Sequence, residues 1–185
     1  MSTLFVNNLN TASGTTITLP TGKQLVVTDT GGLKVPGTVV QHVQLSNTGR
    51  GAQTTHNSNS FTHTGSKFDV TITPKFQTSL ILYNASLSVH AATGSSYGYW
   101  ELRRDIGGTV TSFGDDGNYG MSKIHQGLWL QIPLFYVDSP NTTSAITYKI
   151  FSRANANGNT VYTGWNSASD SKANGCYVSV LEIAQ

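Results

Sequence analysis

The strongest constraint on the fold is an eight-residue repeat at the start of the chain. Aliphatic residues stand eight apart in two columns, with glycine and proline between them. A short strand and a turn together use about eight residues, so this period is typical of a repeating β-structure. Each repeat carries only one or two inward aliphatics, which bury too little apolar surface to offset the entropy of ordering the chain. The first column is Leu9, Ile17, Leu25 and Leu33, and the second is Leu19, Val27 and Val35.

The apolar side chains of these repeats must therefore pack against another chain, and identical segments of the same protein are the simplest partners. We expect residues 1–38 to form an N-terminal anchor and an intertwined β-stalk in a homotrimer, as in a fibre protein. Leu4, Phe5 and Val6 form a short apolar stretch that would dock the N-terminus on another protein. The stalk contacts between the three copies are expected at Leu9, Ile17, Leu25 and Leu33.

The remainder, residues 39–185, predicts a second, all-β domain. Segments rich in β-branched and aromatic residues are separated by clusters of Gly, Asn, Ser and Pro, and no stretch has sustained helical periodicity. About eight to ten strands in this length predict an antiparallel jelly-roll sandwich. The expected strands are Val39–Leu45, Phe68–Thr73, Leu80–Val89, Tyr97–Arg103, Thr109–Phe113, Leu128–Val137, Ala145–Ser152, Thr160–Gly164 and Cys176–Ile183.

Three features of this domain give more specific expectations. The last strand is partly apolar on both faces, which predicts a central position in a sheet or a place at a subunit interface. Trp129 and Phe135 lie in the most apolar strand and are expected in the core. Residues 46–67 and 153–175 are long polar segments, which predict loops at the ends of the sandwich, where binding function is often found.

The composition excludes several classes of function. The net charge is only +2, and the 11 basic residues are scattered, so we expect no nucleic-acid partner. No apolar run is long enough to cross a bilayer, so we expect no membrane insertion, and no secretion signal is apparent at the N-terminus. Cys176 is the one cysteine, so an intrachain disulfide cannot form.

No arrangement of residues indicates catalysis. The nucleophile-elbow pattern, the phosphate loop and the dinucleotide fingerprint are all missing. His56 and His63 fall in a polar segment without a nearby Cys or carboxylate, which predicts exposed side chains rather than metal ligands. Asp115 and Asp116 stand between glycines and predict a turn. We expect no enzyme activity, cofactor or metal; the one metal route left open is an ion held by one His per chain on a three-fold axis.

Aromatic residues are crowded into the second half of the chain, and some fall near glycine-rich turns. Aromatic rings flanked by Asn, Asp and Gln suit sugars, because rings stack on C–H surfaces while amides and carboxylates bond hydroxyls. The alternative is that these rings pack at the seam between subunits. The candidate glycan contacts are Tyr97, Tyr119, Tyr162 and Trp165.

Three stretches resemble short fibre or tail-associated virion proteins of tailed bacteriophages, particularly those of marine bacteria and cyanobacteria. The stretches are LFVNNLNTASGTTITLPTGKQL, FDVTITPKFQTSLILYNASLSV and the closing CYVSVLEIAQ. The resemblance implies a trimeric stalk and a distal knob similar to the jelly roll of the tumour-necrosis-factor and complement families. The stalk is much shorter than that of long host-recognition fibres, which favours a short fibre, a capsid decoration or a terminal tip.

The sequence therefore favours a structural virion protein, made in the host cytoplasm, that docks on a capsid, tail or baseplate protein and presents a knob to host-surface glycan. Three copies would add weak single-site contacts into avidity. The alternative hypothesis is a free-standing carbohydrate-binding, lectin-like module. A polysaccharide-degrading spike is a third hypothesis, for which two carboxylates would have to face one cleft.

Overall fold

The computed structural model describes residues 21–24, 26–28, 32, 34–45, 53–92, 97–114, 119–164 and 176–185. These residues form strands and connecting turns, with one short 3₁₀ turn, η1, and no α-helix among them. The elements are β1 (Val39–Leu45), β2 (Thr54–His56), β3 (Thr62–His63), η1 (Ser66–Phe68), β4 (Val70–Ile72), β5 (Leu80–Ala91), β6 (Tyr97–Ile106), β7 (Thr109–Ser112), β8 (Ser122–His125), β9 (Trp129–Asp138), β10 (Ile146–Ala154), β11 (Val161–Thr163) and β12 (Tyr177–Ile183).

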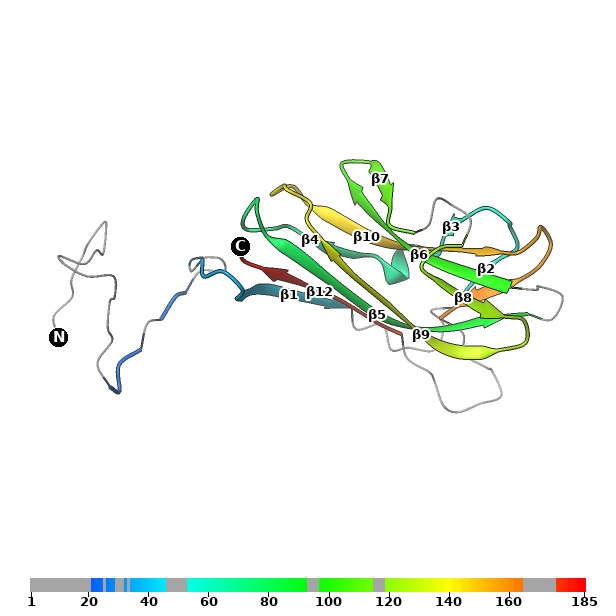
Figure 1. The fold of residues 1–185 in the computed structure, drawn as a ribbon, viewed down its shortest axis with the longest axis horizontal. Coiled ribbons are helices and arrows are strands. Elements are labelled where there is room, and N and C mark those ends of the chain that lie inside the picture. The colour runs from blue at the N-terminus through cyan, green and yellow to red at the C-terminus, as the bar shows by residue number, and fades with distance from the viewer. Residues whose placement is uncertain are drawn as a thin grey trace.

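The strands form two antiparallel sheets, so the predicted all-β sandwich architecture is confirmed (Figure 1). Sheet A has the order β1-β12-β5-β9. In the same sheet, β11 pairs with the C-terminal end of β5, and β2 pairs with β11. In sheet B, β10 pairs with β3, β4 and β6, and β6 pairs with β7 and β8. The chain crosses between the sheets six times, from β2 to β3, β4 to β5, β5 to β6, β8 to β9, β9 to β10 and β10 to β11. Most neighbouring strands in a sheet are therefore distant in sequence, and the β6-β7 hairpin is an exception.

The two sheets enclose one hydrophobic core, because each strand turns alternate residues inward. In β5, the inward series includes Ile81, Tyr83 and Leu87, all fully buried. In sheet B, Trp100 occupies the space beside Gly98, where an added Cβ would lie 2.6 Å from the Trp100 ring. The indole of Trp100 donates to Thr163 Oγ1 of sheet A at 2.7 Å, so a polar contact also joins the sheets.

A buried ion pair provides a second link between the sheets. Asp138, at the end of β9 in sheet A, accepts hydrogen bonds from Arg104 of β6 and from the Tyr148 hydroxyl of β10, each at 2.8 Å. Burial of the Tyr148 hydroxyl, and then the neighbouring Asp138 carboxylate, raise the pKa of this tyrosine. The carboxylate therefore joins one strand of sheet A to two strands of sheet B.

The hairpin between β6 and β7 shows how local sequence sets the register. Gly107 and Gly108 form a two-residue loop, and both have positive φ, 58° and 89°. This backbone matches the right-handed twist of the flanking strands, and glycine adopts it without steric cost. The Gly108 amide also donates to Asp105 Oδ1 at 2.8 Å.

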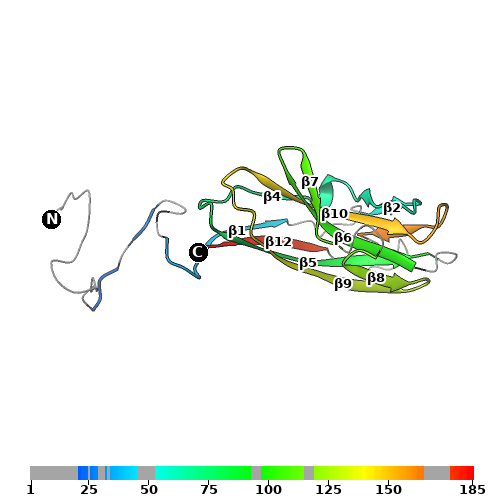
Figure 2. The same ribbon diagram turned by 45° about the horizontal axis from the view of Figure 1, so that its top comes forward.

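The chain enters the sandwich at the end where it also leaves. Gly37 donates its amide to the Ala184 carbonyl at 2.8 Å, and Ala184 donates to the Thr38 carbonyl at 3.0 Å. Both views show the described blue segments before β1 lying outside the sandwich, beyond the end that carries the C-terminus (Figure 2). Among those residues, Val26, Val27 and Val35 are exposed.

Most of the predicted strands are confirmed, and two expectations are wrong. The strand at Val39–Leu45 has the predicted bounds, and β12 lies between β1 and β5, a central position. However, Trp129 and Phe135 are not in the core, because 52% and 59% of their surfaces are exposed. The polar segment 46–67 was expected to be a loop, yet it contains β2 and β3.

Candidate interaction faces

The outer faces of the two sheets differ in charge. Residues that turn away from the core in sheet A form a surface, here named the neutral face, which contains no Asp, Glu, Lys or Arg. By the strand registers and burial patterns, its members are Val39, His42, Gln44, Thr55, Leu80, Leu82, Asn84, Ser86, Ser88, His90, Trp129, Gln131, Pro133, Phe135, Val137, Tyr162, Tyr177, Ser179, Leu181 and Ile183.

The neutral face is most apolar at the end where the chain enters the sandwich. There Val39 pairs with Ile183, which pairs with Leu80. In the next row, Val137 pairs with Leu82, and Leu82 with Leu181. These rows place aliphatic side chains from four adjacent strands next to one another.

At the opposite end the neutral face carries an aromatic cluster. The His90 ring is stacked on Tyr162 at 5.6 Å and meets the edge of Trp129 at 5.1 Å, centroid to centroid. One ring nitrogen of His90, Nδ1, lies 3.0 Å from the Leu128 carbonyl oxygen, which holds the imidazole between the two aromatic rings. Between this cluster and the aliphatic rows lie Phe135 and Tyr177, both exposed.

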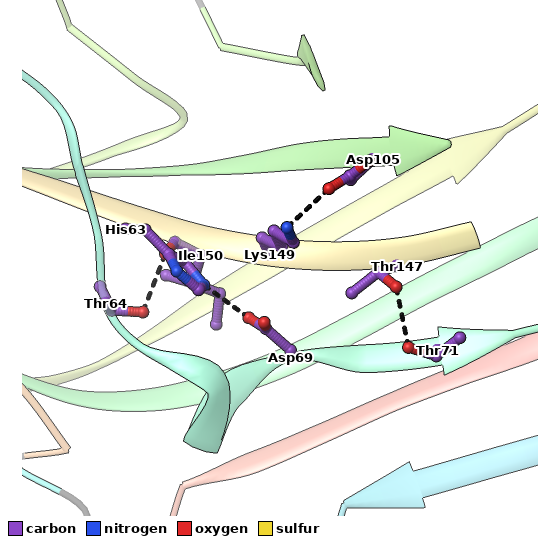
Figure 3. A network of polar contacts seen from close by, with 8 residues as sticks. All are labelled: His63, Thr64, Asp69, Thr71, Asp105, Thr147, Lys149 and Ile150. Atoms are coloured by element: carbon purple, nitrogen blue, oxygen red, sulfur yellow. Dashed lines mark hydrogen bonds and ion pairs between the residues drawn. The ribbon is translucent and has the colours of Figure 1, made fainter. Parts of the chain in front are cut away.

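The outer surface of sheet B, here named the charged face, is crossed by ion pairs. Lys149 Nζ lies 2.6 Å from Asp105 Oδ2, and His63 Nε2 lies 2.7 Å from Asp69 Oδ1 (Figure 3). The face comprises Phe61, His63, Asp69, Thr71, Tyr97, Tyr99, Glu101, Arg103, Asp105, Val110, Ser112, Lys123, His125, Thr147, Lys149, Phe151 and Arg153.

These ion pairs hold neighbouring strands together. The hydrogen bond from Lys149 lowers the pKa of Asp105, and the same bond raises the pKa of Lys149. Beside this pair, the Thr71 and Thr147 hydroxyls are 2.9 Å apart (Figure 3). Arg103 bonds the buried Glu101 of its own strand. The charged face is therefore a set of satisfied polar contacts rather than a row of free charges.

Cations also lie over aromatic rings on the charged face. The Arg153 guanidinium carbon is 4.2 Å from the centroid of Tyr99, and Lys123 Nζ is 4.2 Å from the centroid of Tyr97. Tyr119, which is 58% exposed, lies 6.1 Å from Tyr99. Rings and cations together give this end of sheet B a surface that can contact a polar, ring-shaped ligand.

The structure separates the four candidate glycan residues. Tyr97 and Tyr119 flank Tyr99 at one end of the charged face. Tyr162 lies on the other sheet, in the aromatic cluster of the neutral face. Trp165 is outside the described residues. The described members therefore cannot contact one small glycan together.

The expected docking and stalk residues also fall where the structure gives no description. Leu4, Phe5, Val6, Leu9, Ile17, Leu25 and Leu33 all lie outside the described residues, and so do Asp115 and Asp116. Of the second aliphatic column, Val27 and Val35 are described, and both are exposed. The stalk, the trimer and the division of the chain at residue 38 therefore stay predictions.

The histidine expectation is wrong in its detail. His56 and His63 are both half-buried, and each has a side-chain partner. His56 Nδ1 lies 2.7 Å from the Ser152 hydroxyl, and burial, followed by the nearby His63, lowers the pKa of His56. The carboxylate beside His63 is Asp69, six residues along, which approaches when the chain folds back through η1. The basic pair Arg103-Arg104 likewise has acidic partners.

The sequence reasoning did not find the role of Glu182. This fully buried carboxylate accepts hydrogen bonds from the Lys75 and Phe76 amides, the Ser79 hydroxyl and the Gln41 side chain, at 2.6 to 3.1 Å. The only signal was a carboxylate within an apolar terminal strand. Glu182 fixes β12 to the loop before β5, beside the entry of the chain.

Within the described ranges, no three His, Cys, Asp or Glu side chains are placed to share a metal ion. The same residues include no helix that could span a membrane. Cys176 is buried, which raises the pKa of its thiol. A scan against protein-family models finds no match for the chain, and a search of curated proteins also finds none.

Proposed function

We propose that this chain is a structural, non-enzymatic virion protein of a tailed bacteriophage. It forms a homotrimeric short fibre or decoration, made in the host cytoplasm and carried on the particle. Residues 1–38 form the stalk, with Leu4, Phe5 and Val6 at the docking end, and residues 39–185 form the knob. The knob faces outward, where three copies contact the host surface together.

The observation that carries this proposal is the course of the chain before β1. The described residues before β1, among them Val26, Val27 and Val35, are exposed, and Figure 1 places the first of them beyond the sandwich. Entry and exit lie together at Thr38 and Ala184. A segment that leaves one end of a sandwich with exposed aliphatics would be stabilised by partner chains that bury them.

The order of the strands supports the knob. One sheet runs β1-β12-β5-β9, while the other places β4, β10, β6 and β8 side by side. This order is compatible with the proposed jelly roll, a double-sheet fold built from two Greek keys. The resemblance of the sequence to phage fibres implies a knob of this kind, similar to the tumour-necrosis-factor and complement folds.

A catalytic role is disfavoured by the state of the carboxylates. Each acidic side chain in the described part of the chain has a donor or cation within bonding distance: Asp69, Glu101, Asp105, Asp138 and Glu182. A glycoside hydrolase needs two carboxylates that face a cleft and remain available to the substrate. The proposed activity is therefore binding.

The test is the location of the chain in an infected culture. Particles of a phage that encodes it are purified on a density gradient and probed with antibody against the sandwich. We expect the chain in the particle fraction and gold label at one recurrent site on the particles. A chain that stays in the soluble lysate, while known capsid proteins sediment, would contradict the proposal.

The second candidate function is a free-standing lectin-like module. It is favoured by the exposed Tyr119 beside Tyr99 and Tyr97, with Arg153 and Lys123 over the rings. Strong binding on a glycan array that Tyr119→Ala abolishes and Tyr162→Ala preserves, with no virion association, would favour this module over the virion protein.

A further inference from the structure

The neutral face of sheet A has the composition of a protein interface rather than of a solvent-exposed surface. From the described residues of this protein we infer that a second copy of the same chain covers the neutral face, so that the sandwiches, and not only the stalks, hold the assembly together. The inference rests on the proposed homotrimer and identifies the surface at which its copies meet.

The charge distribution is the first argument. Charged residues are depleted at the centre of protein interfaces, whereas Tyr, Trp and Phe are enriched there. The neutral face lacks charged residues but exposes Trp129, Phe135 and Tyr177. The charged face belongs to the same small domain and has the same strand architecture, yet it contains Lys149, Asp105 and further ion pairs. The difference between the faces therefore does not follow from the composition of the chain as a whole.

The size of the face is the second argument. The strands β1, β12, β5 and β9 have 7, 7, 12 and 10 residues. At the usual spacing and rise they cover roughly 19 Å by 31 Å, on the order of 600 Å² of flat area. Side-chain relief increases this area, and a standard interface buries about 800 Å² on each partner. Only part of this area is exposed apolar surface, contributed by Val39, Trp129, Phe135, Val137 and Tyr177. Contiguous exposed apolar surface of a few hundred Å² marks interaction sites.

Continuity with the leading segment identifies the occupant. The exposed Val35 precedes β1 by a few residues, and Val39 begins β1 on the neutral face beside Ile183. The aliphatic rows continue from there to Val137. Stalks that meet on an axis would bring this end of each sandwich towards the same axis and would raise the local concentration of the faces for one another.

The missing charge also favours a copy over an unrelated partner. A face that meets its own copies must avoid like charges, because like-charge contact at an interface costs several kcal/mol. A face without Asp, Glu, Lys or Arg satisfies this condition in any mutual orientation. It offers no fixed charge that would steer a charged partner of another kind.

The test compares two matched valines on opposite faces. Val137 of β9 lies on the neutral face and Val110 of β7 on the charged face, and each is 46% exposed. The full-length variants Val137→Glu and Val110→Glu are compared with the unsubstituted chain by sedimentation over a range of concentrations. Circular dichroism checks that both variants remain folded.

We expect Val137→Glu to raise the dissociation constant of the assembly by on the order of 100-fold, because a carboxylate would be buried without a partner. Val110→Glu should leave it within about 2-fold, as for an exposed site. In a second measurement, Val137→Cys should be protected from maleimide in the assembly, and Val110→Cys should react.

Each other result overturns the inference. If the chain assembles and both glutamate variants assemble equally, the neutral face is not the contact, while the proposed trimer stands. If Val137→Cys reacts as readily as Val110→Cys in the assembly, the face is open. If Val137→Glu removes binding on a glycan array but not assembly, the occupant is a sugar. A chain that does not self-associate contradicts the proposed homotrimer as well.

Discussion

The two outer faces of the sandwich are both built from antiparallel strands, yet they expose different kinds of side chain to their surroundings. The charged face pairs polar groups across strands, as in the ion pair of Asp105 with Lys149 and the hydrogen bond between His63 and Asp69 (Figure 3). The neutral face leaves Phe135 and Val137 exposed and carries no ion at all. Ion pairs keep a surface soluble and discourage contact between copies, whereas an uncharged surface with aromatic rings permits it. Under the inference drawn above, the charged face would meet solvent and the neutral face would meet a neighbouring copy.

The largest effect is expected where the two sheets are joined. Asp138→Ala would leave the partly buried Arg104 guanidinium and the Tyr148 hydroxyl without their carboxylate, at a cost of about 3–5 kcal/mol in unfolding free energy. Urea unfolding measures the loss, and Asp138→Asn, which keeps an acceptor, should lose less. If Asp138→Ala unfolds at the same urea concentration as the unsubstituted chain, the Asp138 contacts do not contribute to holding the two sheets together.

A smaller but still large effect is expected in the proposed stalk, which precedes β1 in the sequence. Leu25→Asp should lower the melting temperature of the assembly by on the order of 10 °C, because each copy would bring a charge into a shared interior. Lys23→Asp is the control two residues away, at an exposed position. A Leu25→Asp variant that stays trimeric and equally stable would contradict the proposal that Leu25 packs between the copies in a stalk.

Loss of a single ion pair on the charged face should change the unfolding free energy only slightly. Lys149→Met should lower the unfolding free energy by about 0.5 kcal/mol at neutral pH, and Lys149→Arg should restore it. Because Lys149 lowers the pKa of Asp105, this contribution is present above the ordinary pKa of an aspartate and is lost as the pH falls through the lowered value. Thermal unfolding of the two proteins should therefore converge at low pH; a constant difference would exclude the pair as its cause.

The smallest effect concerns the half-buried His56. Burial lowers its pKa, so the unfolded chain takes up a proton before the folded chain does, and stability falls as the pH decreases through the ordinary and then the lowered value. His56→Gln should flatten the dependence of melting temperature on pH between about 8 and 5.5. The exposed His125 of β8 provides the control, and equal slopes for both variants would assign the dependence to other groups.

The sequence predicted the elements well where alternation was regular and poorly where it was not. The strands at Val39–Leu45 and the C-terminus follow from β-branched runs between turn residues. The short, polar strands β2, β3 and β8 carry no such pattern. They form by pairing, β3 and β8 with the long strands β10 and β6, and β2 with the three-residue β11. Trp129 and Phe135 were misplaced because both faces of β9 are apolar, and periodicity alone does not tell which face meets the core.

The candidate site was harder to predict because its chemistry arises from distant pairing. The neutral face combines strands from both ends of the chain, and only the register shows that Val137, Leu82 and Leu181 form one row. The proximity of His63 to Asp69, and the four donors around Glu182, likewise depend on turns that sequence patterns do not specify. The sequence shows directly that few residues are charged. That the outer face of sheet A carries none of them is seen only in the strand registers.

The most direct test of the account is the mass of the full-length chain in solution, measured by sedimentation equilibrium at micromolar concentration. One chain has a mass of 19.8 kDa, and the account predicts a species of three such masses. A single species of 19.8 kDa at all concentrations, with Phe135 and Val137 open to solvent, would contradict it.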